Sequence, residues 1–303
     1  MRQADEVRRW LGNLGGQSIH GSKDTDAENP MAKLIEYGLR AGIPELDEKM
    51  LPYAEQVQPK VQTEDNYRAH TAVPFLIAAG YHHHPQIEAW FRQRLAILNE
   101  TAITMDTDLF LADDEKADIP AAWNKKPVYR ARFFDDTGFR LPSCYDFYAM
   151  AHWSMQTEID ADKILAIVAY LSQEEFQRLI TGKAYGYSPA QKRCWAMGQA
   201  FMACISEARK VLFLELAARF ASCRQKTWFQ TPLAELEACR TSNGTWLFPA
   251  PWLKETANSY YLYSGAHMGL AENRRNRLCR EIESTFRMLN LKRLLQVNQP
   301  AHL

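Results

Sequence analysis

The sequence predicts an all-α protein, an α/α toroid built from helix–turn–helix repeats. Across the 303 residues, few segments alternate apolar and polar side chains as β-strands do. Apolar residues instead recur at helical spacing along most of the chain. One segment shape also occurs several times, and helix pairs of this kind bury their apolar faces by stacking on their neighbours.

Three segments carry the repeat most clearly. Each has an apolar helix, a turn of small residues and a second amphipathic helix, and the three span Leu34–Tyr53, Phe75–Leu95 and Leu214–Leu236. We expect the turns at Ala41–Gly42, Ala79–Gly80 and Phe220–Ala221, and glycine in particular suits the left-handed residue that ends a helix.

The repeats predict one domain over residues 31–303, because a core of this type grows by adding units. Residues 1–30 contain Gly15 and Gly16 followed by a polar run, so we expect a loosely attached N-terminal segment. Between the early and late repeats, Met105–Asp136 is polar and rich in aspartate. We interpret it as a long functional loop or a crossing connection inside the domain.

The composition excludes several classes of partner. Lysine and arginine total 36, as do aspartate and glutamate, so the chain lacks the basic excess of a general nucleic-acid binder. No stretch is apolar for long enough to span a membrane. The first residues lack the apolar core of a signal peptide, and the six cysteines form no Cys-x-x-Cys pair, so we expect a cytoplasmic protein. The oligomeric state stays open.

Two segments in the last third resemble a known superfamily. Thr241–Pro249, which reads TSNGTWLFP, resembles the Asp/Asn-Gly-x-Trp turn between helix pairs of terpenoid cyclases and protein prenyltransferases. Ser259–His267, SYYLYSGAH, is similar to the segment that brings a histidine to zinc in protein prenyltransferase β subunits. The resemblance implies a toroid whose central aromatic cavity shelters an apolar ligand of the isoprenoid type, where cation–π contacts can stabilise cationic intermediates.

The motifs that carry chemistry in that superfamily differ here. The Asp-x-Asp-Asp motif of the cyclases is divided between Asp106-Thr107-Asp108 and Asp135-Asp136. The Asp-x-Cys zinc motif is replaced by Cys144-Tyr145-Asp146, in the reverse order. Neither activity is therefore carried over residue by residue, and we expect neither a bound metal nor a cofactor.

Three aspartates are the candidate catalytic residues. Asp135 and Asp136 adjoin aromatic residues, where burial and mutual repulsion would raise the pKa of one carboxyl and make it a general acid. The alternative is an exposed turn in which they bond their own backbone. Asp146 lies in an apolar helical segment, where a carboxylate faces either a wet cavity or a buried hydrogen-bond partner.

The candidate ligand-binding residues combine aromatic and charged side chains. Glu215 falls on the apolar face of a predicted helix and faces either the cavity or an arginine of a neighbouring helix. Arg274 and Arg275 follow His267 and suit an anionic head group, although a solvated helix face is the alternative. The complete predicted set is Tyr145, Glu215, Trp246, Tyr261, His267, Arg274 and Arg275. Of these, we expect His267 and Arg274 to share one pocket with the three aspartates, lined by Tyr145, Trp246 and Tyr261.

Three functions follow from these patterns. The first is a terpenoid cyclase-like or prenyltransferase-like protein that binds or transforms an apolar, isoprenoid-type ligand. The second is a carbohydrate-active α/α-toroid enzyme, a lyase or a glycosidase, because tyrosine, histidine, arginine and paired carboxylates also suit sugar chemistry. The third is a helical-repeat binding protein without catalytic activity, so the sequence leaves open whether the protein is an enzyme.

Overall fold

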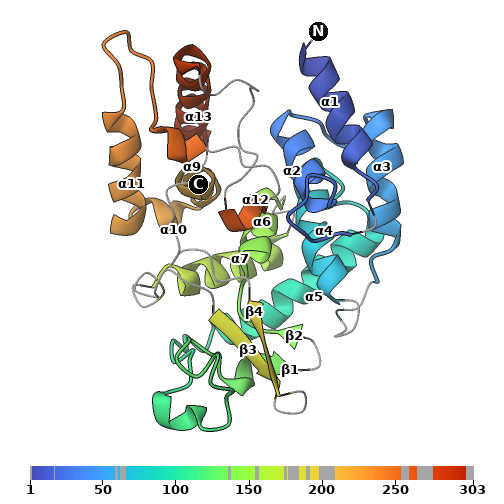
Figure 1. Ribbon diagram of the computed structural model, residues 1–303, viewed down its shortest axis with the longest axis vertical. Helices are drawn as coiled ribbons and strands as arrows, with labels where there is room; N and C mark the ends of the chain where they lie inside the picture. The colour runs from blue at the N-terminus through green and yellow to red at the C-terminus, as the bar shows by residue number, and fades with distance from the viewer. Residues whose placement is uncertain are drawn as a thin grey trace.

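The prediction of an all-α protein is confirmed, because helices dominate the computed structural model (Figure 1). The structure describes residues 2–16, 18–58, 61, 66–135, 138–153, 157–173, 176, 184–188, 192–197, 209–253, 259–264 and 276–297. The helices are α1 (Arg2–Asn13), α2 (Glu28–Glu36), α3 (Pro44–Glu55), α4 (Asn66–Ala79), α5 (Pro85–Ala102), α6 (Cys144–His152), α7 (Glu158–Leu171), α9 (Lys210–Ala217), α10 (Ala221–Arg224), α11 (Thr227–Ala238), α12 (Tyr261–Ser264) and α13 (Arg277–Val297). None of these helices is long and apolar enough to cross a membrane.

The helices pack in two layers, and as far as α10 a helix in one layer contacts the next but one of the described helices. In the first layer, α2 packs on α4, α4 on α6, α6 on α9, and α9 on α13. In the second, α3 packs on α5, α5 on α7, and α7 on α10. Stacked helix–turn–helix units produce this alternation, because each unit gives one helix to each layer.

The predicted turns between the paired helices are confirmed. Gly42 and Gly80 have φ angles of 94° and 101°, in the left-handed region that favours glycine. The two turns also touch, since the Ala41 amide donates to the Ala79 carbonyl at 2.8 Å. In the third repeat, the break falls as expected before Ala221, although the helix that follows is divided into α10 and α11.

The N-terminal segment is packed into the fold, so the prediction of a loosely attached segment over residues 1–30 is wrong. Trp10 and Leu14 are each 2% exposed, and α1 packs on α2 and α3. The physical reason is the helical spacing of Val7, Trp10, Leu11 and Leu14, which gives α1 an apolar stripe. The polar run after Gly16 makes the composition of residues 1–30 polar on average, so composition alone does not indicate this apolar stripe.

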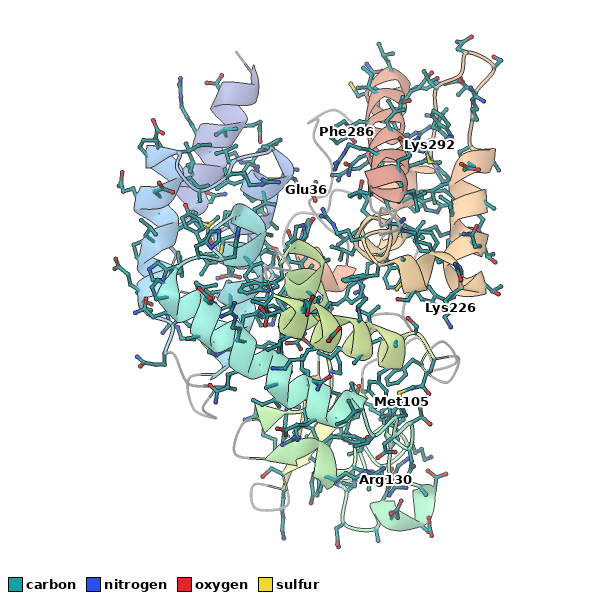
Figure 2. The ribbon with its side chains drawn as sticks, turned by 180° about the vertical axis from the view of Figure 1, so that it is seen from behind. Glu36, Met105, Arg130, Lys226, Phe286 and Lys292 are labelled. Atoms are coloured by element: carbon teal, nitrogen blue, oxygen red, sulfur yellow. The ribbon has the colours of Figure 1, made fainter. Side chains whose placement is uncertain are left out.

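The aspartate-rich stretch is built around two arginines. Arg132 Nη2 lies 2.8 Å from Asp106 Oδ2, and Arg130 Nε lies 2.8 Å from Asp108 Oδ2. The stretch contacts two short antiparallel hairpins, β1–β2 (Phe134–Asp135 with Gly138–Phe139) and β3–β4 (Ala184–Ser188 with Arg193–Met197). Figure 2 shows Arg130 at one end of the molecule, away from Glu36 and Phe286. This region therefore lies apart from the candidate site.

Candidate functional site

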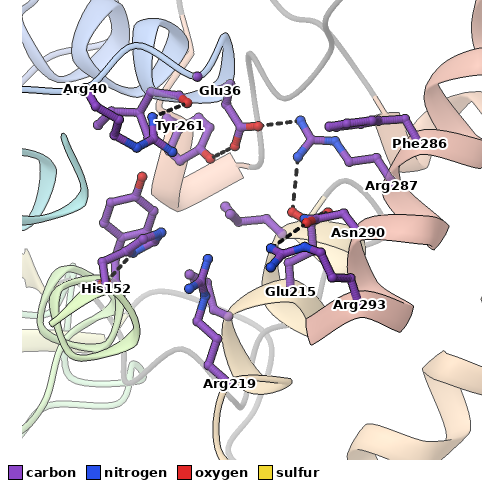
Figure 3. Close-up of a pocket in the computed structure, with 15 residues that line it drawn as sticks. Glu36, Arg40, His152, Glu215, Arg219, Tyr261, Phe286, Arg287, Asn290 and Arg293 are labelled. Carbon is purple, nitrogen blue, oxygen red and sulfur yellow. Dashed lines mark hydrogen bonds and ion pairs between the residues drawn. The ribbon is translucent and has the colours of Figure 1, made fainter. Parts of the chain in front are cut away.

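A cavity of about 240 Å³ lies where α2, α6, α9, α12 and α13 meet (Figure 3). Two helix ends position charged side chains at its wall. The helix α2 ends before Gly38, whose φ of 84° reverses the chain and brings Arg40 to the cavity. The helix α9 ends at Ala217, and the following turn contributes Arg219.

Arg287 is the centre of the charged network in this cavity. Its side chain is 3% exposed, and its Nη2 donates to Glu36 Oε2 at 2.6 Å while its Nη1 donates to Glu215 Oε2 at 3.1 Å. One turn further along α13, Asn290 Nδ2 donates to Glu215 Oε1 at 3.1 Å. Residues three apart on a helix share a face, so α13 binds α2 and α9 through adjacent side chains.

Burial affects the two sides of this network differently. Burial raises the pKa of Glu215, and the nearby Arg287 guanidinium only partly opposes this effect. Burial also disfavours the charge on Arg287, but Glu36 and Glu215 outweigh it, so the pKa of Arg287 lies above its ordinary value. Arg287 therefore stays charged, whereas burial makes the charge on Glu215 costly.

The opposite wall is formed by aromatic and imidazole groups of α6 and α12. The Tyr261 hydroxyl donates to Glu36, and the Tyr261 and Tyr148 ring centroids lie 6.1 Å apart with an edge-to-face orientation. His152 Nδ1 donates to the Tyr148 carbonyl at 2.8 Å. Burial, together with the charges of Arg219 and Arg40, lowers the pKa of His152 to about 3. The imidazole is therefore neutral at pH 7, with Nε2 as a hydrogen-bond acceptor.

Positive charge is in excess in the cavity. The described residues that line it include four arginines, Arg40, Arg219, Arg287 and Arg293, but only two carboxylates. Arg287 holds both carboxylates, while the hydrogen bonds of Arg40 and Arg293 run to uncharged oxygens. Burial lowers the pKa of Arg219 even though Glu215 opposes the effect. Figure 3 shows the Arg219 guanidinium between His152 and Glu215. Such a cavity attracts anions.

Two of the predicted ligand-binding residues, Glu215 and Tyr261, line this cavity. Both interpretations of Glu215 apply, since it faces the cavity and also pairs with Arg287. Trp246 lies elsewhere, in the turn after α11, with Lys292 Nζ 4.8 Å from its ring centroid. Asp136, His267, Arg274 and Arg275 lie outside the described residues, and for Asp135 only its place in β1 is described.

Asp146 is a buried and fully bonded carboxylate that does not line the cavity. Arg94 donates to it through Nε at 2.9 Å and through Nη2 at 3.0 Å, and Asp146 also completes the capping box of α6 with Ser143. Burial would raise the pKa of Asp146, but Arg94 and His70 outweigh burial and hold it well below its usual range. Its neighbour Tyr145 is likewise outside the cavity and donates to Glu28 at 2.5 Å.

The residues that the sequence analysis missed are those that the chain brings together over long distances. Arg287 and Glu36 are 251 positions apart, so no local pattern relates them. A weaker signal was present in α13. Ser284, Met288 and Leu291 are buried at helical spacing, and Arg287 falls on the same face. A charged residue on a buried face needs a partner.

No protein-family model matches this chain, and no curated protein or solved structure is similar to it. Among the described residues, no three histidine, cysteine, aspartate or glutamate side chains gather as the ligands of a metal ion would.

Proposed function

We propose that this protein binds a small organic anion, a carboxylate or a phosphate ester, in the cavity between α2, α6, α9 and α13. The observation that carries the proposal is the arginine excess. The described residues that line the cavity include four arginines and two carboxylates, and Arg287 pairs with both carboxylates, so the described walls present a net positive charge to a ligand. Guanidinium groups bind carboxylate and phosphate through paired hydrogen bonds.

The volume and the walls limit the rest of the ligand. A cavity of about 240 Å³ is smaller than the usual drug-sized pocket, so it suits a compact metabolite. Tyr148 and Phe286 offer ring surfaces to the uncharged part of the ligand. His152 adds a neutral acceptor for a hydroxyl group.

The architectural part of the proposal is that the two helical layers close into the α/α toroid predicted from the sequence. Its support is the alternating packing, together with the contacts of α12 on both α2 and α6. The ion pair between Arg287 and Glu36 also joins α13, at one end of the first layer, to α2 at the other. The cavity would then lie at the centre of the ring.

An isoprenoid diphosphate is a second candidate ligand, and one observation favours it. Phe286 is 47% exposed at the cavity wall, next to the charged Arg287, so an apolar chain could continue from an anionic head group along an aromatic surface. In this arrangement the arginines bind the diphosphate. A uronate, from the carbohydrate alternative, would present its carboxylate to the same arginines.

Calorimetric titration of the protein separates these ligands. The probes are inorganic diphosphate, geranyl diphosphate and glucuronate, with methyl glucoside as the uncharged control. We expect at least one anion to bind, and Arg219→Gln to weaken it roughly tenfold or more, as the loss of a charged hydrogen bond does. Arg8→Gln is the matched control, because Arg8 is 78% exposed and is not among the described residues that line the cavity.

The relative affinities identify the class of ligand. Tighter binding of geranyl diphosphate than of diphosphate supports the isoprenoid, and preference for glucuronate supports the sugar acid. Absence of binding by all three anions, or equal binding by the Arg219→Gln variant and the unaltered protein, would refute the anion site.

A further inference from the structure

Two histidines from different helical units flank Tyr145 on α6. The His20 ring centroid lies 6.0 Å from that of Tyr145, and the His70 centroid lies 5.9 Å from it. Each histidine side chain is 26% exposed, so solvent reaches both imidazoles. The anion cavity uses neither of them.

Each imidazole is held by a carboxylate that is only 1% exposed. His20 Nδ1 lies 3.0 Å from Glu28 Oε1, and His70 Nε2 lies 3.1 Å from Asp146 Oδ2. Among the described residues, His20 Nε2 and His70 Nδ1 take part in no hydrogen bond. A carboxylate that fixes one ring nitrogen and leaves the other available is the usual setting of a general acid or base.

The neighbouring serine is not a nucleophile in this arrangement. Ser143 Oγ lies 2.9 Å from His70 Nε2, the same nitrogen that contacts Asp146. In a catalytic triad, the serine and the carboxylate contact opposite nitrogens of the ring. Here Ser143 also donates to Asp146 at 2.7 Å and caps α6, so its role is structural.

The two imidazoles differ in the charge that they face. Arg94 pairs with Asp146, so His70 and Arg94 contact the same carboxylate. Glu28 has no such partner in the described part of the chain: besides His20, it accepts from the Tyr145 hydroxyl and from the Gly21 amide, which are both uncharged. His20 therefore contacts a buried carboxylate that it shares with no other charged group of the described residues, whereas His70 shares its carboxylate with a guanidinium.

Aromatic rings complete the surroundings of His20. The Tyr67 ring centroid lies 5.4 Å from that of His20, and the Tyr260 centroid lies 5.0 Å from it. Tyr67 is 55% exposed, which leaves its ring available to a ligand. Rings next to hydrogen-bonding imidazoles suit a compound with both a carbon skeleton and several hydroxyl groups.

We propose that His20 and His70 are the proton-transfer pair of a second site, which acts on an α-hydroxy carbonyl compound such as a reducing sugar. His70 Nδ1 removes the proton from the carbon next to the carbonyl. The electron pair of that C–H bond moves to the carbonyl oxygen, which takes a proton from His20 Nε2 to give an enediol. The reverse transfer at the neighbouring carbon gives the isomer, so protons and electrons balance without an oxidant or a leaving group.

This site goes beyond the proposed anion binding, although the same elements build both. Glu28 of α2, Tyr145 of α6 and Tyr260 next to α12 belong to the proton-transfer site. Glu36, Tyr148 and Tyr261, from the same three elements, line the anion cavity. Because the charged groups of the two sites are separate, a substitution in one leaves the other testable.

Deuterium exchange tests the proposal directly. The protein is incubated in D₂O with glucose, fructose, glucuronate or galacturonate, and proton NMR follows the loss of the signal at the carbon next to the carbonyl. We expect exchange in at least one compound, reduced roughly 100-fold or more by His20→Gln and by His70→Gln, as the loss of acid–base catalysis implies. His83→Gln, at an exposed histidine, should keep the rate.

Exchange no faster than in buffer for all four compounds would overturn the proposal, as would equal rates in the unaltered protein and both histidine variants. Circular dichroism and urea unfolding show whether each variant is folded. As a second readout, Glu28→Gln should lower the exchange rate while the protein stays folded, because it removes the carboxylate that holds His20 Nδ1. An unchanged rate would contradict His20 as the proton donor.

Discussion

At the scale of single residues, the two buried carboxylates Asp146 and Glu215 differ in what neutralises them. Among the described carboxylates, Arg94 pairs with Asp146 only, and it donates to both of its oxygens. Glu215 shares Arg287 with Glu36. As a result, the pKa of Asp146 lies well below the ordinary range of a carboxyl group, whereas burial raises that of Glu215. Asp146 is suited to a structural role, and Glu215 lies in a cavity where a bound ligand can alter its charge.

The substitution Asp146→Asn tests the structural role. It leaves Arg94 buried without a counter-charge, so we expect a loss of about 3–5 kcal/mol in the free energy of unfolding at pH 7. In the unaltered protein, the unfolded chain takes up the Asp146 proton near the ordinary pKa of about 3.9, whereas the native state does so only at lower pH. The stabilisation is therefore lost as the pH falls, and the difference between the two proteins narrows.

Urea unfolding at pH 7 and pH 3.5 checks this expectation. Asp113→Asn is the matched control, because the Asp113 side chain is 97% exposed, and it should change stability by less than about 0.5 kcal/mol. A difference between Asp146→Asn and the unaltered protein that does not narrow at low pH would contradict the assigned ionisation.

At the scale of elements, the sequence was informative wherever a local conformation had a local cause. Gly42 and Gly80 predicted the turns because a positive φ is cheap only for glycine, and the structure has both angles. The N-terminal helix was misjudged because composition was weighed over the spacing of its apolar residues. The paired turns also allow the cost of backbone strain to be measured without a change in the core.

We predict that Gly42→Ala and Gly80→Ala each destabilise the protein by about 1–2 kcal/mol, the cost of a Cβ atom in the left-handed region. A Cβ at Gly42 would meet nothing within 4 Å, so its cost is conformational alone. A Cβ at Gly80 would touch the Ala41 side chain at 3.5 Å, which is an ordinary contact.

Gly12→Ala is the control. Gly12 lies inside α1 with open space around it, so alanine should stabilise by about 0.5–1 kcal/mol. Thermal unfolding of the three variants is sufficient, and a neutral Gly42→Ala variant would contradict the expectation.

At the scale of the whole molecule, the helical repeats were predictable but the site was not. Periodicity and turn residues act over a few positions, which is the range that a sequence pattern reports. The cavity depends instead on Arg287 meeting Glu36 and Glu215, which lie 251 and 72 positions away. Helical spacing predicts that Glu215 lies on an inward face, but a local pattern cannot identify which of the chain's arginines is its partner, because that depends on how the layers pack.

This long-range network leads to the last prediction. Arg287→Met would leave Glu36 and Glu215 buried between helices without their shared cation, so we expect a loss of about 3–5 kcal/mol in the free energy of unfolding at pH 8. The loss should be smaller at pH 5, because burial already raises the pKa of Glu215 and a protonated carboxyl needs no counter-charge.

Lys292→Met on the same helix is the matched control, since its pair with Glu237 at 3.5 Å is exposed and should contribute at most about 1 kcal/mol. Urea unfolding at both pH values, repeated in about 1 M salt, measures all of these effects. Salt should abolish the contribution of Lys292 and leave most of that of Arg287, because buried charges are screened much less than exposed ones. If the two variants behaved alike, Arg287 would not be the buried connection between α13 and the helices α2 and α9, and the cavity would lose the residue that holds its walls together.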